Sequence, residues 1–162
     1  AMTSKTKASK TTAIAILATM VMLCNSCIDS TIQHQYRHTN NGTWFRNDTL
    51  TYELPAAKTE GLYSIDTELR MPVPCQYKRI WIIREISLLA PLAYRKDTIC
   101  IDTEESGIFS ERKGMTVRCY SHKDTTLFLK EGQKGSLKLY HAMSREELTQ
   151  ITDIGIRIRS IR

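Results

Sequence analysis

The sequence lacks an apolar run long enough to cross a membrane as a relaxed helix. Its longest uncharged and largely apolar run, residues 11–23, has 13 residues, whereas a membrane-spanning helix needs about 20. Proline and glycine are scarce, with four and seven copies in 162 residues, and no internal repeat or low-complexity block is visible. This composition indicates one globular domain with a short additional segment.

The sequence also lacks the short motifs that carry common enzymatic chemistry. It contains no Gly-x-Ser-x-Gly elbow, His-Glu-x-x-His motif, phosphate-binding loop or calcium loop. The cysteines after residue 27 show no zinc-binding spacing. His34 and His38 have the spacing of metal ligands on a helix, but they lie in a polar stretch without a helix signal. We therefore predict no catalytic residues, no metal and no cofactor.

The N-terminus carries the pattern of an export signal. Three lysines within the first ten residues precede residues 11–23, whose length is that of the hydrophobic region of a signal peptide. The small residue Ser26 directly precedes Cys27, and this arrangement resembles the lipobox of bacterial lipoproteins. An uncleaved signal anchor and lipid attachment at Cys24 are the alternatives.

We predict that residues 1–26 form a lipoprotein signal peptide, with Ala1 as a cloning scar, and that Cys27 carries the lipid. Residues 27–42 are predominantly polar and are expected to form a lipidated tether between the membrane and the folded domain. Two or three acyl chains hold a protein firmly at a bilayer, so the predicted membrane anchor needs no transmembrane helix.

The charge of the chain does not indicate a nucleic-acid partner. Removal of the three leader lysines from the 23 basic residues leaves 20, against 17 acidic residues, which is a net charge of +3. No basic cluster reaches the density of a nucleic-acid-binding surface. The C-terminal arginines, Arg157, Arg159 and Arg162, are expected on the solvated face of a strand.

Three cysteines follow Cys27 in what would be an oxidising compartment. One expectation is a disulfide between Cys100 and Cys119, which lie in neighbouring expected strands, with Cys75 left free. The other is that all three are buried free thiols.

Beyond the tether the pattern is that of strands. Residues 62–71 alternate, with Tyr63, Ile65, Thr67, Leu69 and Met71 on one face and polar residues on the other. Residues 78–89 are the most apolar segment and are expected to form a central strand packed on both faces. Similar reasoning predicts strands within residues 49–54, 98–103, 115–121, 125–130, 137–142 and 154–159.

The predicted fold is an all-β, antiparallel sandwich of about eight strands, jelly-roll-like, that occupies residues 43–162. Ser144 and Glu147 form a capping box, which predicts one short helix within residues 144–150. Exposed aromatic rings can stack on sugars, so a lipid-anchored carbohydrate-binding module is the alternative function. Trp44 is its candidate binding residue, and Trp81 is expected in the core.

Several segments, taken in order, resemble the GldH gliding-motility lipoproteins of Bacteroidetes. They are the lipobox, residues 63–70 (YSIDTELR), residues 79–83 (RIWII), residues 97–99 (DTI), residues 141–143 (HAM) with Leu148, and residues 151–158 (ITDIGIRI). The resemblance covers nearly the whole chain from Cys27 onward. The stretch before the central strand and the turn within residues 107–114 depart from the family pattern.

This resemblance implies a non-enzymatic cell-envelope lipoprotein. Its implied partners are the membrane, through the lipid, and other envelope proteins of the gliding and secretion-associated machinery. Only Asp29 supplies an acidic charge just after Cys27, which is not the acid-rich start expected for surface display in these bacteria. We therefore expect an outer-membrane position that faces the periplasm.

Overall fold

A computed structural model describes residues 30–104, 108–112, 115–123 and 127–161 of the chain. Every regular element in these residues is a strand, and the strands pair in antiparallel fashion. In chain order they are β1 (Thr31–His38), β2 (Thr43–Phe45), β3 (Leu50–Leu54), β4 (Gly61–Pro72), β5 (Arg79–Leu89), β6 (Ala93–Asp102), β7 (Ile108–Arg112), β8 (Met115–His122), β9 (Leu127–Leu129), β10 (Lys134–His141), β11 (Glu147–Thr149) and β12 (Asp153–Ile161).

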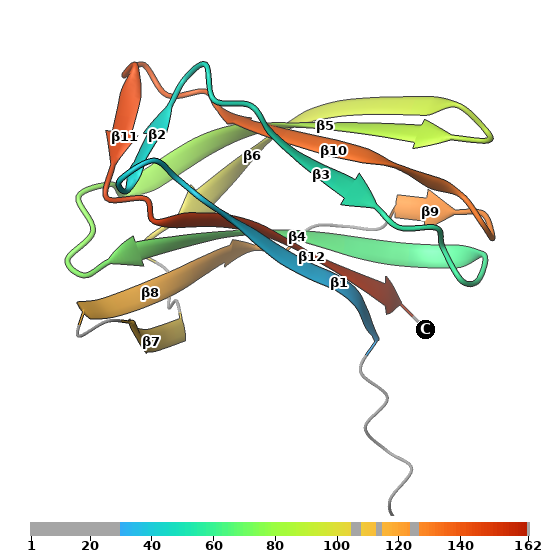
Figure 1. The fold of residues 1–162 in the computed structure, drawn as a ribbon, viewed down its shortest axis with the longest axis horizontal. Helices are drawn as coiled ribbons and strands as arrows, with labels where there is room; N and C mark the ends of the chain where they lie inside the picture. The colour runs from blue at the N-terminus through green and yellow to red at the C-terminus, as the bar shows by residue number, and fades with distance from the viewer. Residues whose placement is uncertain (1–29, 105–107, 113–114, 124–126, 162) are drawn as a thin grey trace, which may run out of the picture. The chain divides into compact units, whose positions relative to one another are not determined.

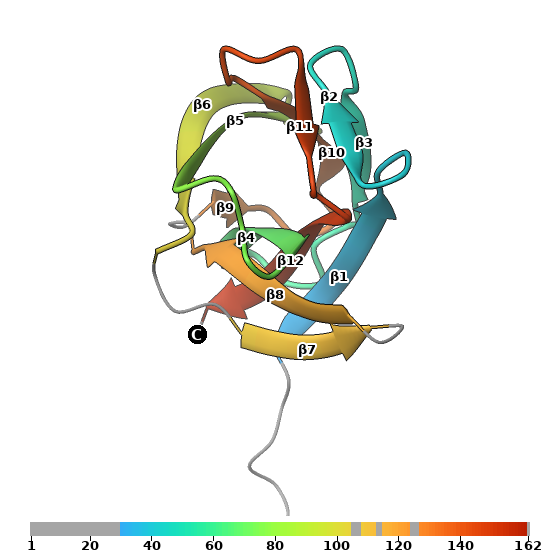
Figure 2. The ribbon, with the colours of Figure 1, turned by 90° about the vertical axis from the view of Figure 1, so that its left-hand side faces the viewer.

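The strands form two sheets stacked as a sandwich (Figures 1 and 2). The six-stranded sheet has the order β1-β12-β4-β8-β7, and β9 pairs with the first residues of β4 on the same side as β8. The four-stranded sheet has the order β3-β10-β5-β6. A separate ribbon of β2 and β11 lies at one end of the sandwich. The predicted all-β sandwich is therefore confirmed.

The core lies between the inward faces of the two sheets, and it follows from alternation along each strand. The expected inward face of β4 is buried throughout, and the buried isoleucines of β12 alternate with Gly155 and Arg157. The four-stranded sheet contributes the buried residues Ile80, Ile82, Leu137 and Leu139.

All eight segments expected to be strands contain one, but the chain forms additional strands. Residues 31–38, expected within the tether, instead form the edge strand β1, which pairs with β12 from Thr31 to His38. The expected helix at residues 144–150 is wrong in the same way. Glu147–Thr149 is the strand β11, in which Leu148 lies opposite Trp44 and is fully buried. This pairing overrides the local capping signal.

The central strand β5 is packed on one face only. Ile80 and Ile82 are fully buried, whereas Trp81 is 45% exposed on the outward face of the four-stranded sheet. The expectation that Trp81 lies in the core is therefore wrong. In the described part of the chain, no helix has the length and apolar character needed to cross a membrane.

Candidate functional site

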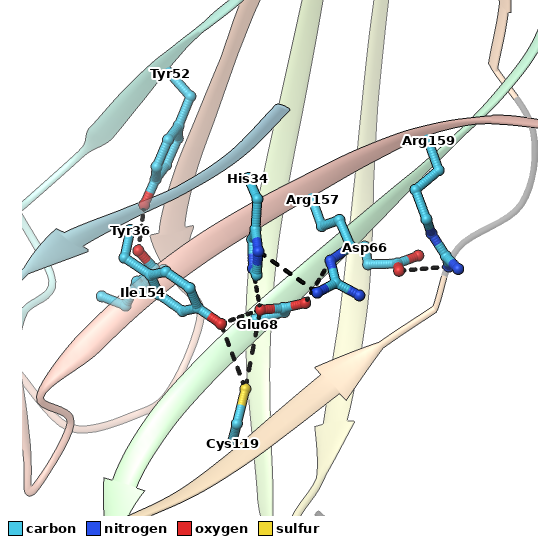
Figure 3. A network of polar contacts seen from close by, with 9 residues as sticks. All are labelled: His34, Tyr36, Tyr52, Asp66, Glu68, Cys119, Ile154, Arg157 and Arg159. Atoms are coloured by element: carbon cyan, nitrogen blue, oxygen red, sulfur yellow. Dashed lines mark hydrogen bonds and ion pairs between the residues drawn. The ribbon is translucent and has the colours of Figure 1, made fainter. Parts of the chain in front are cut away.

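The outward face of the six-stranded sheet carries a cluster of polar side chains that is unusual for an external face. Side chains from four adjacent strands converge there, and Figure 3 shows all of them except Arg70. We call this group the outer-face cluster, and its members are His34 and Tyr36 of β1, Asp66, Glu68 and Arg70 of β4, Cys119 of β8, and Arg157 and Arg159 of β12.

Two carboxylates form the buried floor of the cluster. Asp66 and Glu68 are only 3% and 6% exposed although they point away from the core. Burying a carboxylate is costly unless partners compensate for the lost hydration. Nη2 of Arg159 lies 2.6 Å from Oδ2 of Asp66, and Nε of Arg157 lies 3.8 Å from Oε1 of Glu68. The acids of β4 and the arginines of β12 therefore form diagonal ion pairs across two neighbouring strands.

The edge strand β1 covers this floor with two rings. Nε2 of His34 lies 2.8 Å from Oε2 of Glu68, and the hydroxyl of Tyr36 donates a hydrogen bond to the same oxygen. Tyr36 can reach Glu68 only by crossing β12, and it does so over Gly155, which lies between them in the register. The guanidinium carbon of Arg70 lies 3.6 Å from the centre of the Tyr36 ring, a cation–π contact.

Gly155 is the residue that permits this crossing. A Cβ atom at this position would lie 2.5 Å from Cδ1 and 2.6 Å from Cε1 of Tyr36. Nonbonded carbon atoms prefer separations of about 3.5–4.0 Å, so any other side chain would displace the ring. The Gly155 backbone thus forms the seat for the Tyr36 ring.

Tyr36 and Cys119, which both contact Glu68, keep their protons at neutral pH. Burial, followed by the hydrogen bond to Glu68, raises the pKa of Tyr36 well above its ordinary value. Burial also raises the pKa of the Cys119 thiol, whose sulfur lies 3.5 Å from the Tyr36 hydroxyl. A thiol with a raised pKa is a weak nucleophile. The cluster is therefore suited to rigid hydrogen bonding and charge presentation.

The accessible side of the cluster differs in character from its floor. The side chains of His34, Arg157 and Arg159 are 30%, 39% and 35% exposed, whereas the two carboxylates below them are almost completely covered. A molecule that approaches this face meets donor and cationic groups whose positions are fixed by buried acids. This preorganisation lowers the entropic cost of recognising a partner.

The residues predicted from sequence are distributed differently. Cys27, the predicted lipid attachment site, lies outside the described residues. Trp44, the predicted sugar-stacking residue, is 1% exposed, and its Nε1 donates a hydrogen bond to the carbonyl oxygen of Asp48 at 3.0 Å. Trp44 is therefore a core residue, and its assignment as an exposed platform is wrong.

The predicted disulfide is also contradicted. Cys100 and Cys119 are both free thiols, and Cys75 is free as well. Cys100 lies opposite Trp81 on the outward side of the four-stranded sheet, whereas Cys119 belongs to the outer-face cluster of the other sheet. The alternative of three free thiols agrees with the structure, although each of them is only partly buried.

The two histidines assigned to a polar tether in fact lie on one face of β1, with Tyr36 between them. His34 contacts Glu68, and Nδ1 of His38 contacts the carboxylate of the fully buried Asp153. Within the described residues, no group of three or more histidine, cysteine, aspartate or glutamate side chains is arranged to hold a metal ion.

Sequence reasoning missed the outer-face cluster because it assigned both rows of charge to solvent. A usable signal was present. The acids of β4 at 66 and 68 and the arginines of β12 at 157 and 159 have the same spacing of two, and Gly155 continues the outward row of β12. A glycine in such a row indicates that something approaches the backbone closely.

Comparisons with known proteins were made with family models, curated proteins and solved structures. No curated protein matches the chain. Among solved structures, Eiger TNF from S. frugiperda is similar with a TM-score of 0.37, 9% identity, and coverage of 80% of this chain and 90% of that one. Dimeric latent PorU from Porphyromonas gingivalis is similar with a TM-score of 0.33, 12% identity, and coverage of 84% of this chain and 13% of that one.

The family model described as GldH lipoprotein matches residues 31–158. The match begins at the first residue of β1 and ends within β12, so it includes every residue of the outer-face cluster except Arg159. It also contains the segment with Gly155. The chain belongs to the GldH lipoprotein family.

Proposed function

We propose that this protein is a non-enzymatic envelope component that a lipid on Cys27 holds at the outer membrane, where it serves the gliding and secretion-associated machinery. The observation that carries this proposal is the family match over residues 31–158, which spans almost the whole sandwich. The lipid concentrates the domain at the membrane, and the domain supplies contacts with other envelope proteins.

Lipid attachment is tested by a matched pair of variants in the native bacterium. Cys27→Ser should leave the precursor uncut and abolish labelling with a fatty-acid probe. Cys24→Ser, three residues earlier, should leave cleavage and labelling unchanged. Normal labelling of the Cys27 variant would refute the assignment, and loss of labelling in the Cys24 variant alone would move the lipid to that residue.

The expected orientation has its own test. A lipoprotein on the periplasmic face of the outer membrane should resist protease added to intact cells and become sensitive once the outer membrane is permeabilised. Digestion of the protein in intact cells would contradict the periplasmic orientation without affecting the lipid assignment.

The outer-face cluster is the surface that we propose for protein contacts. Its support is that the partly exposed side chains of His34 and Arg157 are both held in place by contacts with the buried Glu68. A photo-crosslinking residue at position 34 should capture envelope proteins, whereas the same residue at the exposed position of Glu53, on the other sheet, should not. Equal capture from both positions would refute this placement.

A second candidate function, carbohydrate binding, is favoured by one observation. Trp81 is 45% exposed on an outward sheet face, where the Tyr140 hydroxyl donates a hydrogen bond to Glu85 at 2.7 Å. An exposed aromatic ring on the same sheet face as fixed polar groups offers a surface on which a sugar could stack. Binding on a glycan array that is lost in Trp81→Ala would support this role, and an array without any binding would remove it.

A further inference from the structure

Exposed apolar side chains of this protein concentrate at one end of the sandwich. Three of them, Leu62 of β4, Phe128 of β9 and Ile161 of β12, are 44%, 52% and 41% exposed. The register pairs Leu62 with both of the others, so the three side chains form a continuous row across three strands. Leu62 and Phe128 point outward, because their strand neighbours Tyr63 and Leu129 belong to the core. Ile161 lies opposite Leu62 in the register and therefore shares its outward face.

The hairpin of β5 and β6 adds a second apolar group at the same end. Leu89, Leu92 and Tyr94 are 49%, 84% and 62% exposed around its turn. This turn is fixed to the turn between β9 and β10, because Nε2 of Gln133 donates a hydrogen bond to the Pro91 carbonyl oxygen at 2.9 Å.

These two groups contain most of the exposed apolar side chains. Of the nine large hydrophobic residues exposed in the described part of the chain, six lie at this end. Leu62, Phe128 and Ile161 are contiguous in the register, and contiguous exposed apolar surface marks a contact with a partner or with a membrane. The exposed Phe45 lies in the ribbon of β2 and β11 at the other end.

The chain enters the sandwich at the apolar end. Thr31, the first residue of β1, is paired with Arg159, two residues before Ile161. Figure 1 shows the start of β1 and the end of β12, which is marked C, at the same end of the sheet. Only three residues separate Thr31 from Cys27, so covalent geometry limits the distance between their Cα atoms to about 14 Å.

We infer that the apolar end of the sandwich contacts the bilayer that holds the Cys27 lipid. This inference rests on the proposed lipid attachment at Cys27 and adds an orientation to it. The six side chains enter the boundary between headgroups and acyl chains, to a depth of about 5–10 Å. The tyrosine suits this boundary because its ring is apolar and its hydroxyl remains hydrated. The ribbon of β2 and β11 then points away from the membrane.

The test uses two tryptophan reporters in the full lipidated protein. Phe128→Trp places a reporter in the apolar row, and Phe45→Trp places a matched reporter at an exposed phenylalanine of the opposite end. Each protein, and the parent with its own two tryptophans, is reconstituted in phosphatidylethanolamine–phosphatidylglycerol vesicles with or without brominated acyl chains. Co-sedimentation with the vesicles measures anchoring separately from quenching.

We expect both variants to co-sediment with the vesicles. The added emission of a variant is its tryptophan fluorescence minus that of the parent, and bromine should quench roughly half of it in Phe128→Trp, given a depth of about 5–10 Å. The added emission of Phe45→Trp should be unchanged. If both proteins co-sediment and the reporter at 128 is not quenched, or is quenched no more than the reporter at 45, the orientation is wrong while the anchor stands. A second copy that covers the row would give this result. Failure of both proteins to co-sediment would refute the anchor and the orientation together.

Discussion

Replacing Gly155 with alanine should destabilise the protein only when Tyr36 is present. The new Cβ would lie 2.5 Å from Cδ1 of Tyr36, about 1 Å inside ordinary contact distance. The ring cannot move away freely, because its hydroxyl is bonded to Glu68 and Arg70 lies 3.6 Å from its centre. Overpacking of this kind costs about 1–3 kcal/mol.

The same substitution has a favourable component that does not depend on the ring. Gly155 does not have a positive φ angle, so alanine can adopt its backbone conformation. Replacing glycine at a compatible position stabilises a protein by about 0.4–1 kcal/mol through the unfolded state. In a Tyr36→Ala background we therefore expect Gly155→Ala to be neutral or slightly stabilising.

The assay is a double-mutant cycle in urea, in which the four proteins are compared by their free energies of unfolding. Alanine at 155 should lower the stability of the parent by about 1–2 kcal/mol, and the coupling energy between the two positions should be about 1–3 kcal/mol. If Gly155→Ala changes the free energy of unfolding equally in the parent and in the Tyr36→Ala background, the proposed packing of the Tyr36 ring on Gly155 is wrong.

Three further predictions concern the core and its polar groups. Arg84 is fully buried and donates hydrogen bonds to both carboxylate oxygens of Asp97, at 3.1 and 2.8 Å. Arg84→Ala should therefore lower the free energy of unfolding, measured by urea titration, by about 3–5 kcal/mol. The double variant Arg84→Met with Asp97→Leu should lose less, because it leaves no unpaired charge. Gly135→Ala should lower the free energy of unfolding at least as much as Gly155→Ala does, because its Cβ would lie 2.1 Å from the backbone oxygen of Ser87. Since the clash is with backbone, no second side-chain substitution should restore the lost stability. Burial, followed by the charge of Arg46, lowers the pKa of His141. The unfolded state therefore binds the proton more tightly, and stability should fall as pH drops below about 6.5, an effect that His141→Phe should remove.

The core could be predicted from sequence because its signal is local. Strand β4 alternates on its inward face from Tyr63 to Met71, and β12 alternates through its isoleucines, so period two alone identifies which side chains face inward. The same alternation did not reveal that Glu68 is buried on the opposite face. That burial depends on His34 and Tyr36, which are more than 30 residues away in the sequence.

The two tryptophans show the same limit of local reasoning. Trp44 follows a polar turn and was expected to be exposed, but pairing of β2 with β11 places it against the fully buried Leu148 and the ring of His141. Trp81 lies between isoleucines and was expected to be buried. Its position in the alternation of β5 places it on the outward face instead. Strand pairing decides the position of Trp44 and alternation within the strand decides that of Trp81, and neither follows from the hydrophobicity of the neighbouring residues.

The reassignment of residues 31–38 changes the physical nature of the anchor. A flexible tether of 15 residues after Cys27 would have an end-to-end distance of about 20–23 Å and would let the domain rotate freely above the membrane. Because β1 is paired with β12 from Thr31 onward, only residues 28–30 separate Cys27, the proposed lipid attachment site, from the paired strand. With a lipid on Cys27, as proposed, the strand that supplies His34 and Tyr36 to the outer-face cluster would also restrain the domain relative to the bilayer. A contact surface on such a domain is held in a narrow range of heights and orientations, which raises its effective concentration toward membrane-bound partners more than a long tether would.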